Sequence, residues 1–299
     1  MEEESGYLAA EGFERDLEHE LGGVTKRYGR LILAPGPPRP AAWAQNVWQA
    51  PHAIEVGSIT DAARKLRAIQ RNWALYDFKL HRRAKLIQEQ LPHVSAKPVP
   101  FPCELPKAPL GSWTLLAENR LLASPHCSSP FRHGEVEFIE DRTGPPNRAY
   151  LKLWEAFTLL GVRPAAGERC LDLGASPGGW SWALQALGCH VLSVDKAPLD
   201  PRVAALPGIE YRAASAFSLA PAEVGPVDWL LSDVVCYPRR LWRLVQGWLA
   251  SGLARHYLCT LKFQGETDHA TAAAFAAVPG SRLLHLHHNK HELTWAKLG

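Results

Sequence analysis

The sequence predicts an α/β protein whose main part is a mostly parallel β-sheet with helices on both faces. From Arg148 to the C-terminus, short apolar strands alternate with helices, the pattern typical of such a sheet. A glycine-rich loop joins the first strand of this series to its helix, as in many nucleotide-binding α/β folds. The two closing strands, 282–288 and 292–297, are too near each other for a crossover helix. One strand near the C-terminus should therefore run antiparallel to the rest.

The composition bounds the class of protein. Its 299 residues, 46% hydrophobic and 21% charged, suit a globular protein with one full α/β domain and a smaller unit. The net charge of +3 permits a nucleic-acid partner without requiring one. The chain opens on an acidic segment, no apolar run approaches the ~18 residues of a membrane helix, and the six cysteines show no C-x-x-C spacing. We therefore expect a cytoplasmic protein with free thiols and no membrane partner.

Residues 1–146 should form the smaller region, with mixed α+β structure. Its expected elements are a strand over 6–10, a helix with Phe13, Leu17 and Leu21 on one face, a strand over 24–33, a helix capped by Ser58, and strands over 113–117, 121–124 and 136–140. The proline-rich segment 35–40 is expected to end the first elements, and the proline-rich segment 92–109 to form an extended connector. The turn-forming residues 141–147 mark the boundary to the α/β domain at 147–299.

The stretch 64–85 concentrates positive charge. It carries eight lysines and arginines against the single acid Asp77, a net charge of +7, with Trp73, Tyr76 and Phe78 between them. Cations hold phosphates and aromatic rings stack on unpaired bases, so the stretch is a candidate RNA-binding element. The alternative is a solvated helix face whose aromatic residues pack on the core.

In the α/β domain the sequence gives a regular series of elements. They are a helix over 148–160, a strand around Leu171, a helix over 180–187, strands over 190–195, 209–213 and 227–233, a helix over 239–253, a strand over 255–263, a helix over 267–277 and the two closing strands. Ligands of such sheets bind at the carboxyl ends of the strands, where Gly174, Asp195, Asp233 and Phe263 fall.

The glycine-rich loop is the first candidate binding element. It runs through Gly174, Ser176, Pro177, Gly178, Gly179 and Trp180. Its glycines let the backbone turn sharply and approach a ligand, and the open start of the following helix offers unpaired N–H groups. Asp195 ends the next strand, 16 residues after Gly179, near the spacing at which an acid takes a ribose diol. The alternative is an ordinary glycine-rich turn between a strand and a helix.

Four charged residues occupy helix starts or strand ends in the same domain: Lys152, Asp233, Lys262 and Glu292. Taken singly, each is most simply explained as a surface salt bridge. Together with the D-x-G-x-x-P-G-G-W loop and the segments Ser232-Asp233 and Leu261-Lys262-Phe263-Gln264-Gly265, they resemble the FtsJ/RrmJ-like 2′-O-ribose RNA methyltransferases. The resemblance covers about half of the chain, from Arg148 to the end. Within that superfamily the chain is similar to the RlmM-type enzymes, which methylate a cytidine ribose of 23S rRNA.

The resemblance implies a Rossmann-like fold, S-adenosyl-L-methionine as cofactor and RNA, an rRNA or a pre-ribosomal particle, as partner. It implies that the cofactor is bound by Gly174, Ser176, Pro177, Gly178, Gly179, Trp180, Asp195, Ser215 and Asp233. Ser215 takes the place at which the family often has an acid for the adenine amino group. The family carries an N-terminal RNA-binding region that includes a THUMP domain, and residues 12–15 of this chain echo its opening faintly. Either a degenerate THUMP-like module or a different RNA-binding domain is therefore expected at the N-terminus.

The residue types suit transfer to a ribose hydroxyl. A lysine acts as general base only when its pKa falls well below about 10.4, and a neighbouring ammonium and partial burial both lower it. Lys262 is the expected base and Lys152 the neighbouring cation. Asp233 and Glu292 are expected to orient the two lysines and to balance their charge.

Other readings remain open at this point. Cys236 follows Asp233 in a D-x-x-C pattern seen in cytosine-5 RNA methyltransferases, but Val235 stands where those enzymes have proline. The chain could also be a catalytically silent RNA-binding protein on a methyltransferase scaffold, or a methyltransferase for protein or small molecules. Four histidines near the C-terminus are expected on an exposed strand rather than at a metal, because no acid or cysteine cluster completes a site: His285, His287, His288 and His291.

Overall fold

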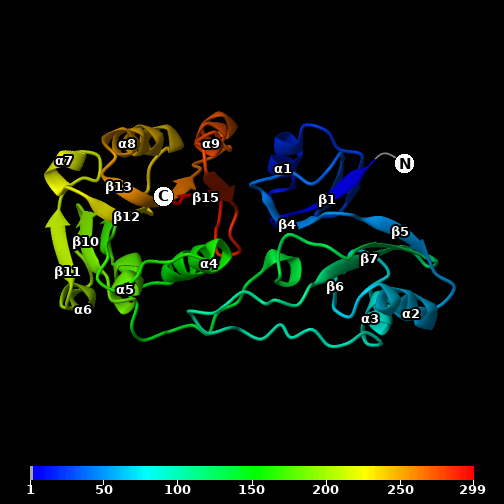
Figure 1. Cartoon of the computed structure of the whole chain (residues 1–299). Coiled ribbons are helices and arrows are strands. Elements are labelled where there is room, and N and C mark those ends of the chain that lie inside the picture. The colour runs from blue at the N-terminus through cyan, green and yellow to red at the C-terminus, as the bar shows by residue number, and fades with distance from the viewer. Residues whose placement is uncertain (1–2) are drawn as a thin grey trace. The chain divides into compact units, whose positions relative to one another are not determined.

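The computed structural model describes residues 3–299 and divides the chain into two compact units (Figure 1). The N-terminal unit holds the described residues up to Pro100 together with Glu104–Glu137. The C-terminal unit holds Phe101–Cys103 and Phe138–Gly299. The division by contacts thus falls after residue 137, and the functional boundary expected after residue 146 stays a prediction. No helix among the described residues is long and apolar enough to cross a membrane.

The N-terminal unit contains two four-stranded sheets, each with its own helices. The first has the order β2-β3-β1-β4, and its elements are β1 (Glu4–Ala9), α1 (Glu14–Leu21), β2 (Lys26–Tyr28), β3 (Leu31–Pro35) and β4 (Ala44–Trp48). The second has the order β5-β8-β7-β6, and its elements are β5 (His52–Glu55), α2 (Ile59–Ile69), β6 (Trp73–Leu75), α3 (His81–Gln88), β7 (Gly111–Ala117) and β8 (Arg120–Ser124). A short 3₁₀ turn, η1 (Arg132–Gly134), follows.

Local sequence signals account for most of these elements. Ser58 caps α2 by accepting a hydrogen bond from the backbone N–H of Asp61, and Gly22 ends α1 in a left-handed conformation, both as expected. The expected strand over 24–33 is wrong, because Gly29 turns the chain with a φ of 63° and makes a hairpin of β2 and β3. The expected strand over 136–140 is also wrong: these residues form no strand, only an isolated bridge position at 138.

The basic stretch 64–85 is not one element. It spans most of α2, all of β6 and the first half of α3. Trp73 is fully buried in the core between these helices and the second sheet, and its indole N–H donates to the carbonyl of Leu66. Tyr76 is half-buried and its hydroxyl donates to the carbonyl of Tyr28. The aromatic residues therefore pack in the core, as the second interpretation held, whereas most of the cations stay exposed.

The C-terminal unit is a seven-stranded sheet with the order β11-β10-β9-β12-β13-β15-β14. Its elements are α4 (Tyr150–Leu160), β9 (Arg169–Leu173), α5 (Gly179–Ala186), β10 (His190–Asp195), α6 (Pro201–Ala204), β11 (Ile209–Ala213), α7 (Pro221–Val224), β12 (Val227–Ser232), α8 (Pro238–Ser251), β13 (Ala254–Lys262), α9 (His269–Ala276), β14 (Ser281–Leu284) and β15 (Glu292–Lys297). In Figure 1, α4, α5 and α6 cover one face of the sheet and α7, α8 and α9 the other.

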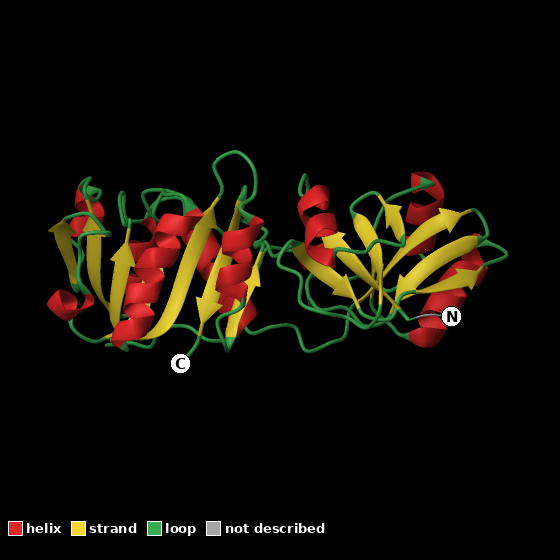
Figure 2. Cartoon of the chain, turned by 90° about the horizontal axis from the view of Figure 1, so that it is seen from above, coloured by secondary structure: helices red, strands yellow, loops and turns green. Residues whose placement is uncertain are grey.

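The predicted fold class is confirmed. Strands β9 to β13 pair in parallel, and β15 is antiparallel to both of its neighbours, β13 and β14. The arrangement is the Rossmann-like sheet expected from the alternation of strands and helices (Figure 2). The central strands are buried on both faces, as their continuous apolar sequences require.

The end of the chain differs from the expectation in one respect. Strand β14 ends at Leu284, so residues 285–291 form a loop instead of the second half of a strand. His285 is 7% exposed and its Nε2 lies 3.0 Å from the carbonyl oxygen of Lys290. The expectation of exposed strand histidines is therefore wrong. Among residues 3–299, no group of three or more His, Cys, Asp or Glu side chains could hold a metal ion.

Candidate active site

The topology of the C-terminal unit brings the four charged residues together at one edge of the sheet. Asp233 follows the last residue of β12, and Lys262 ends the neighbouring strand β13. Glu292 begins β15, which runs antiparallel to β13, so that Lys262 and Glu292 are directly paired in register. Lys152 comes from the first turn of α4 on one face of the sheet. Three neighbouring strands and one helix thus supply the tetrad Lys152–Asp233–Lys262–Glu292.

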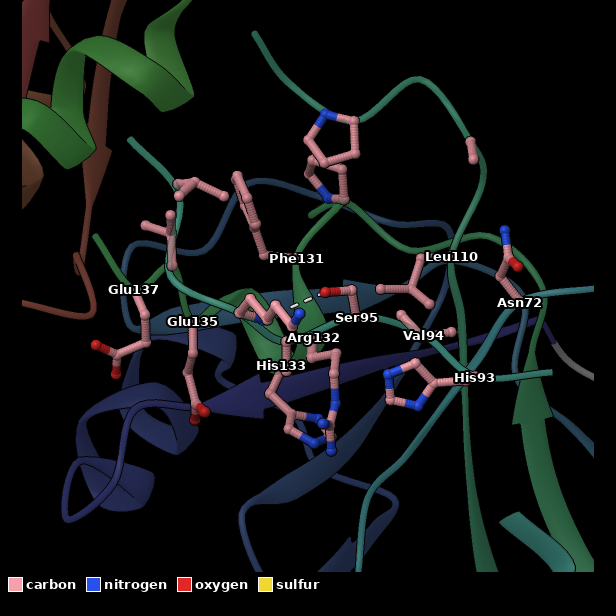
Figure 3. A pocket seen from close by; sticks show the side chains of 17 residues that line it. Asn72, His93, Val94, Ser95, Leu110, Phe131, Arg132, His133, Glu135 and Glu137 are labelled. Atoms are coloured by element: carbon pink, nitrogen blue, oxygen red, sulfur yellow. Dashed lines mark hydrogen bonds between the residues drawn. The ribbon is translucent and has the colours of Figure 1, made fainter. Parts of the chain in front are cut away.

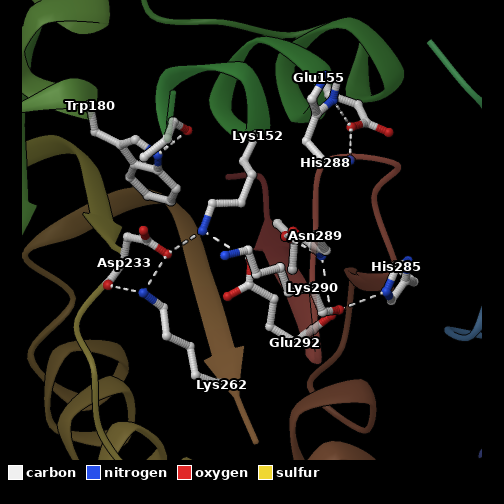
Figure 4. A network of polar contacts seen from close by, with 12 residues as sticks. Lys152, Glu155, Trp180, Asp233, Lys262, His285, His288, Asn289, Lys290 and Glu292 are labelled. Atoms are coloured by element: carbon white, nitrogen blue, oxygen red, sulfur yellow. Dashed lines mark hydrogen bonds and ion pairs between the residues drawn. The ribbon is translucent and has the colours of Figure 1, made fainter. Parts of the chain in front are cut away.

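The four side chains form a continuous polar network (Figure 4). The ammonium of Lys152 donates to Asp233 Oδ1 at 2.8 Å and to Glu292 Oε1 at 3.0 Å. The ammonium of Lys262 donates to the backbone carbonyl of Asp233 at 2.6 Å and lies 3.1 Å from Asp233 Oδ1. Asp233 is therefore the shared acceptor of both lysines. The structure brings together all four residues that the sequence singled out.

The charges of this network are balanced and largely withdrawn from water. The side chains are between 10% and 19% exposed, and two cations face two anions. Burial by itself would lower the pKa of Lys152, but the carboxylates of Asp233 and Glu292 outweigh burial and raise it. Lys152 therefore keeps its proton, which suits a fixed cation. Removing any one member would leave an unbalanced charge in this partly buried network.

The glycine-rich loop lies between β9 and α5 in the same unit. Gly174 has a φ of 81°, and a Cβ there would lie 2.6 Å from the Cα of Val234, so only glycine fits. The Ser176–Pro177 peptide bond is cis. Helix α5 starts after Gly178 without a side-chain cap, so the N–H groups at its start have no capping side chain, as expected from the loop.

Asp195 ends β10 beside this loop. Its Oδ2 accepts the backbone N–H of Ser176 at 3.1 Å, and its Oδ1 accepts that of Ala197 at 3.0 Å. The hydroxyl of Ser176 donates to the carbonyl of Pro198. The carboxylate thus fixes the loop, and each of its oxygens retains a lone pair for a further donor such as a ribose hydroxyl.

Trp180 and Gly179 connect the loop to the helix that carries Lys152. Trp180 is 3% exposed, and its indole N–H donates to the carbonyl of Ala149, immediately before α4. A Cβ on Gly179 would lie 2.1 Å from the side-chain oxygen of Asn147, which accepts the N–H of Ala149. In the structure, these two residues hold the start of α4 against the loop. The indole N–H of Trp180 is thus bound inside the protein, and its expected cofactor contact stays a prediction.

A cavity of about 180 Å³ lies along the carboxyl ends of β9, β10 and β11. It is lined by Gly174, Val194, Asp195, Lys196, Ala214, Ser215, Ala216, Phe217, Val234, Val235 and Arg240. The guanidinium carbon of Arg240 lies 3.9 Å from the centre of the Phe217 ring. Ser215 lines the cavity where the family often has an acid. The combination of an apolar wall, an acid at the ribose position and an open helix start fits an adenosine-containing cofactor with a carboxylate.

Asp172 is a buried acid beneath the loop to which the sequence assigned no role of its own. It is 1% exposed, its Oδ2 accepts the hydroxyl of Ser181 at 2.7 Å, and its Oδ1 has no partner. Burial raises the pKa of Asp172 to about 7, although the Ser181 hydrogen bond lowers it. The D-x-G segment shows that an acid stands at this position. That its pKa is raised follows only from its complete burial in the structure.

Glu155 is a second residue that the sequence did not single out. It lies one helical turn after Lys152 and is fully buried. Its carboxylate accepts the backbone N–H groups of His287 and His288, at 2.6 and 3.0 Å, and lies 2.6 Å from His288 Nδ1 (Figure 4). Glu155 thus holds the 285–291 loop, which leads into Glu292. A glutamate at a buried position of an otherwise apolar helix was the available signal.

Cys236 shows no sign of a nucleophile. It is 7% exposed, and burial raises the pKa of its thiol, although Arg240 and Lys262 oppose the shift. A thiol that keeps its proton is a poor attacking group. The cysteine-based alternative is therefore not favoured.

The N-terminal unit has a cavity of its own, of about 570 Å³ (Figure 3). It contains none of the tetrad or loop residues. Phe131, His93, Asn72, Arg132 and His133 are among the side chains that line it. His133 has a φ of 57°, and its Nδ1 is buried without a partner. Cations and an aromatic ring in one hollow are compatible with a nucleic-acid contact but do not specify one.

Comparison with known proteins agrees with the chemistry of the C-terminal unit. Residues 145–263 match the FtsJ-like methyltransferase family. The chain is 39% identical to the ribosomal RNA large subunit methyltransferase M of Halorhodospira halophila over 157 residues, covering 50% of this chain and 46% of that protein. Proteins of the same name from Thauera aminoaromatica and Xanthomonas campestris are 34% and 42% identical, covering 50% and 39% of this chain and 45% and 35% of theirs.

The chain spans about half the length, or less, of the curated relatives that it matches. The family match lies wholly within the C-terminal unit and includes the glycine-rich loop and three members of the tetrad, Lys152, Asp233 and Lys262. The expectation drawn from the sequence motifs is confirmed: the C-terminal unit carries an FtsJ-like methyltransferase domain.

Proposed function

We propose that this protein transfers a methyl group from S-adenosyl-L-methionine to a ribose 2′-hydroxyl of RNA. The observation that carries the proposal is the tetrad, in which two lysines and two carboxylates meet within hydrogen-bond distance in a domain of the FtsJ-like family. The name of the relatives supports large-subunit rRNA as the substrate, and the family resemblance supports a cytidine of 23S rRNA. With such a substrate the expected compartment is the cytoplasm.

Lys262 is proposed as the general base. A ribose hydroxyl is a weak nucleophile, so its proton must leave as the oxygen attacks the methyl carbon. The Lys262 side chain takes that proton, and the backbone carbonyl of Asp233, 2.6 Å away, directs its amino group. Lys152 stays charged and holds both carboxylates, so the cationic Lys262 formed by the transfer still faces Asp233.

The cofactor is proposed to bind in the cavity beside the glycine-rich loop. Asp195 takes the ribose diol, Ser215 takes the adenine, and the open start of α5 takes the methionine carboxylate. Gly174, Ser176, Pro177, Gly178, Gly179, Trp180 and Asp233 complete the proposed set. When bound, S-adenosyl-L-methionine supplies an electrophilic methyl group on a sulfonium, which leaves as a neutral thioether.

The N-terminal unit is proposed to hold the RNA. Its exposed cations on α2 and α3 and the cations around its cavity provide a surface for phosphates. The same proposal includes that this unit is a degenerate THUMP-like module. The rival proposal, a catalytically silent RNA-binding protein, is less favoured because the tetrad is complete and its contacts are formed.

The test is methyl transfer from labelled S-adenosyl-L-methionine to an unmodified 23S rRNA transcript, followed by digestion to nucleosides. We expect label in a 2′-O-methylated nucleoside, and in cytidine above the others. Label in 5-methylcytosine would restore the Cys236 alternative. Binding of the RNA without transfer would favour the silent RNA-binding protein.

A further inference from the structure

The loop between Asp233 and α8 carries an unusual surface. Val235 and Tyr237 are 73% and 64% exposed, more than any other large hydrophobic side chain among residues 3–299. Single exposed apolar side chains are ordinary on protein surfaces and need no explanation. Here the two most exposed ones stand two positions apart, directly after the acid that both lysines of the tetrad contact. The apolar pair therefore lies next in sequence to the proposed reaction site.

The loop presents these side chains from a fixed backbone. Its residues alternate between exposed and buried: Val235 and Tyr237 face outward, whereas Cys236 and Pro238 are buried. Pro238 is the first residue of α8, and the carbonyl of Tyr237 accepts the N–H groups of Arg240 and Leu241. An aromatic ring on such an anchored backbone loses little conformational freedom when a ligand binds it.

The surface next to this loop is cationic. Helix α8 contains Arg239, Arg240 and Arg243 and no acidic residue, and its N-terminus adds a partial positive charge. Arg240 is engaged with the ring of Phe217, at the cofactor cavity. Arg239, which is 79% exposed, has only a loose pair with Asp268 at 3.6 Å, and Arg243 is exposed one turn further along. Two arginines thus remain available to phosphates beside the apolar pair.

We propose that Val235 and Tyr237 form a stacking platform for an unpaired nucleotide of the RNA substrate, whose flanking phosphates contact Arg239 and Arg243. The proposal rests on the proposed function. An aromatic face beside cations matches the two chemically distinct parts of a nucleotide, its base and its phosphates. A base inside a duplex has both faces stacked already, so the platform selects single-stranded or extruded nucleotides.

The experiment uses the full chain and a mixed-sequence 12-nucleotide RNA, single-stranded or in a duplex, with S-adenosylhomocysteine present. Tyr237→Ala should weaken binding of the single strand by at least about fivefold, the lower end of what one stacked base contributes. Tyr237→Phe keeps the ring and should bind like the wild type. Ile139→Ala removes another side chain of the same unit that is 61% exposed and should also bind like the wild type. Binding of the duplex should be the same for all four proteins.

Three results would overturn the platform. The first is Tyr237→Ala binding the single strand as tightly as the wild type. The second is an equal loss of S-adenosyl-L-methionine affinity without RNA, which would assign the loop to the cofactor site. The third is a wild-type dimer that Tyr237→Ala converts to monomer, which would assign the patch to a second copy of the chain.

Methyl transfer to 23S rRNA transcript separates this inference from the proposed function. A wild type that transfers, with Tyr237→Ala reduced mainly through a higher KM for RNA, supports both. Equal kcat/KM for the two proteins would refute the platform and leave the function standing. A wild type that transfers no methyl group to any RNA would refute both.

Discussion

At the scale of single residues, the proposed activity depends on how the carboxylate and the backbone carbonyl of Asp233 accept hydrogen bonds from the two lysines. Its side chain faces Lys152 and Lys262, and its backbone carbonyl accepts a further bond from Lys262. Lys152 also binds Glu292, so its role as a fixed cation is satisfied within the protein. Both contacts of Lys262 in the described network are to Asp233, and it shares the Asp233 carboxylate with Lys152. This difference in contacts supports the proposed role of Lys262 as the general base.

Lys262→Ala should lower the rate of methyl transfer by about 10²–10⁴-fold, because removal of a general base costs about that much. Its affinity for S-adenosyl-L-methionine should stay close to that of the wild type, since Lys262 does not line the cofactor cavity. Single-turnover kinetics and isothermal titration measure the two quantities. A variant with near-full single-turnover rate would contradict the assignment of the base.

Asp172 gives the domain a stability that depends on pH. The folded protein keeps the Asp172 proton up to a pKa of about 7, whereas the unfolded chain loses it near the ordinary value of 3.8. The folded state thus binds the extra proton between these values, so this contribution is complete below about pH 4 and is lost as pH rises to about 7. The loss amounts to about 1.4 kcal/mol for each pH unit of the window.

Asp172→Asn should remove this dependence. Urea unfolding at pH 5, 6, 7 and 8 should therefore show the variant gaining stability relative to the wild type as the pH rises to 7, and no further gain above it. Other titrating groups cancel in the difference between the two proteins. Parallel stability curves for wild type and variant would show that Asp172 is ionised in the folded state.

At the scale of elements, the positions of most strands and helices along the chain follow from sequence, but the loops that complete the site do not. The strands β9, β10, β12 and β13 can be recognised in the sequence as short apolar runs. Because they are parallel, their carboxyl ends lie side by side. The strand expected over 282–288 fails because its second half is held in a loop by Glu155, a residue more than 130 positions earlier. Local patterns cannot contain such a long-range contact. Short strands such as β5 and β6 could not be predicted for the same reason, because they are defined by pairing with β8 and β7 and not by a local sequence pattern.

Glu155→Gln tests whether this contact supports the site. An amide can accept only one of the two backbone N–H groups well and turns its own N–H₂ toward the other, so we expect a loss of roughly 1–3 kcal/mol of stability. The loop leading to Glu292 loosens, and kcat should fall by more than tenfold while affinity for S-adenosyl-L-methionine holds. Glu168→Gln, which changes a carboxylate bonded to Trp229 and the N–H of Ala165, is the matched control and should keep its kcat.

At the scale of the whole molecule, the two units have different proposed roles: the C-terminal unit transfers the methyl group and the N-terminal unit holds the RNA. The fold and the tetrad of the C-terminal unit could be predicted because their residues follow a family order. In the N-terminal unit several strands and helices could be predicted from local patterns, but their pairing into two sheets and the cavity could not. The excess of positive charge at 64–85 correctly predicted exposed cations. It could not predict that the side chain of Trp73 is buried in the core.

Replacing three exposed cations of this unit, Lys79, Arg82 and Lys85, with alanine should weaken RNA binding and flatten its dependence on salt. Each lost phosphate contact lowers the log–log slope by roughly 0.7–0.9. The control removes the same charge from Arg27, Lys107 and Arg120, which sit in exposed ion pairs of little energetic weight. Superimposable salt titrations of the test variant and the wild type would make the stretch a solvated surface only.

The central claim is ribose methylation of large-subunit rRNA, and mapping of 2′-O-methyl groups on that rRNA tests it most directly. The RNA is taken from cells that carry the gene, lack it, or lack it and express the Lys262→Ala protein. The account predicts one ribose methylation, on a cytidine, that is present in the first cells and absent from the other two. An identical ribose methylation map in all three would contradict it.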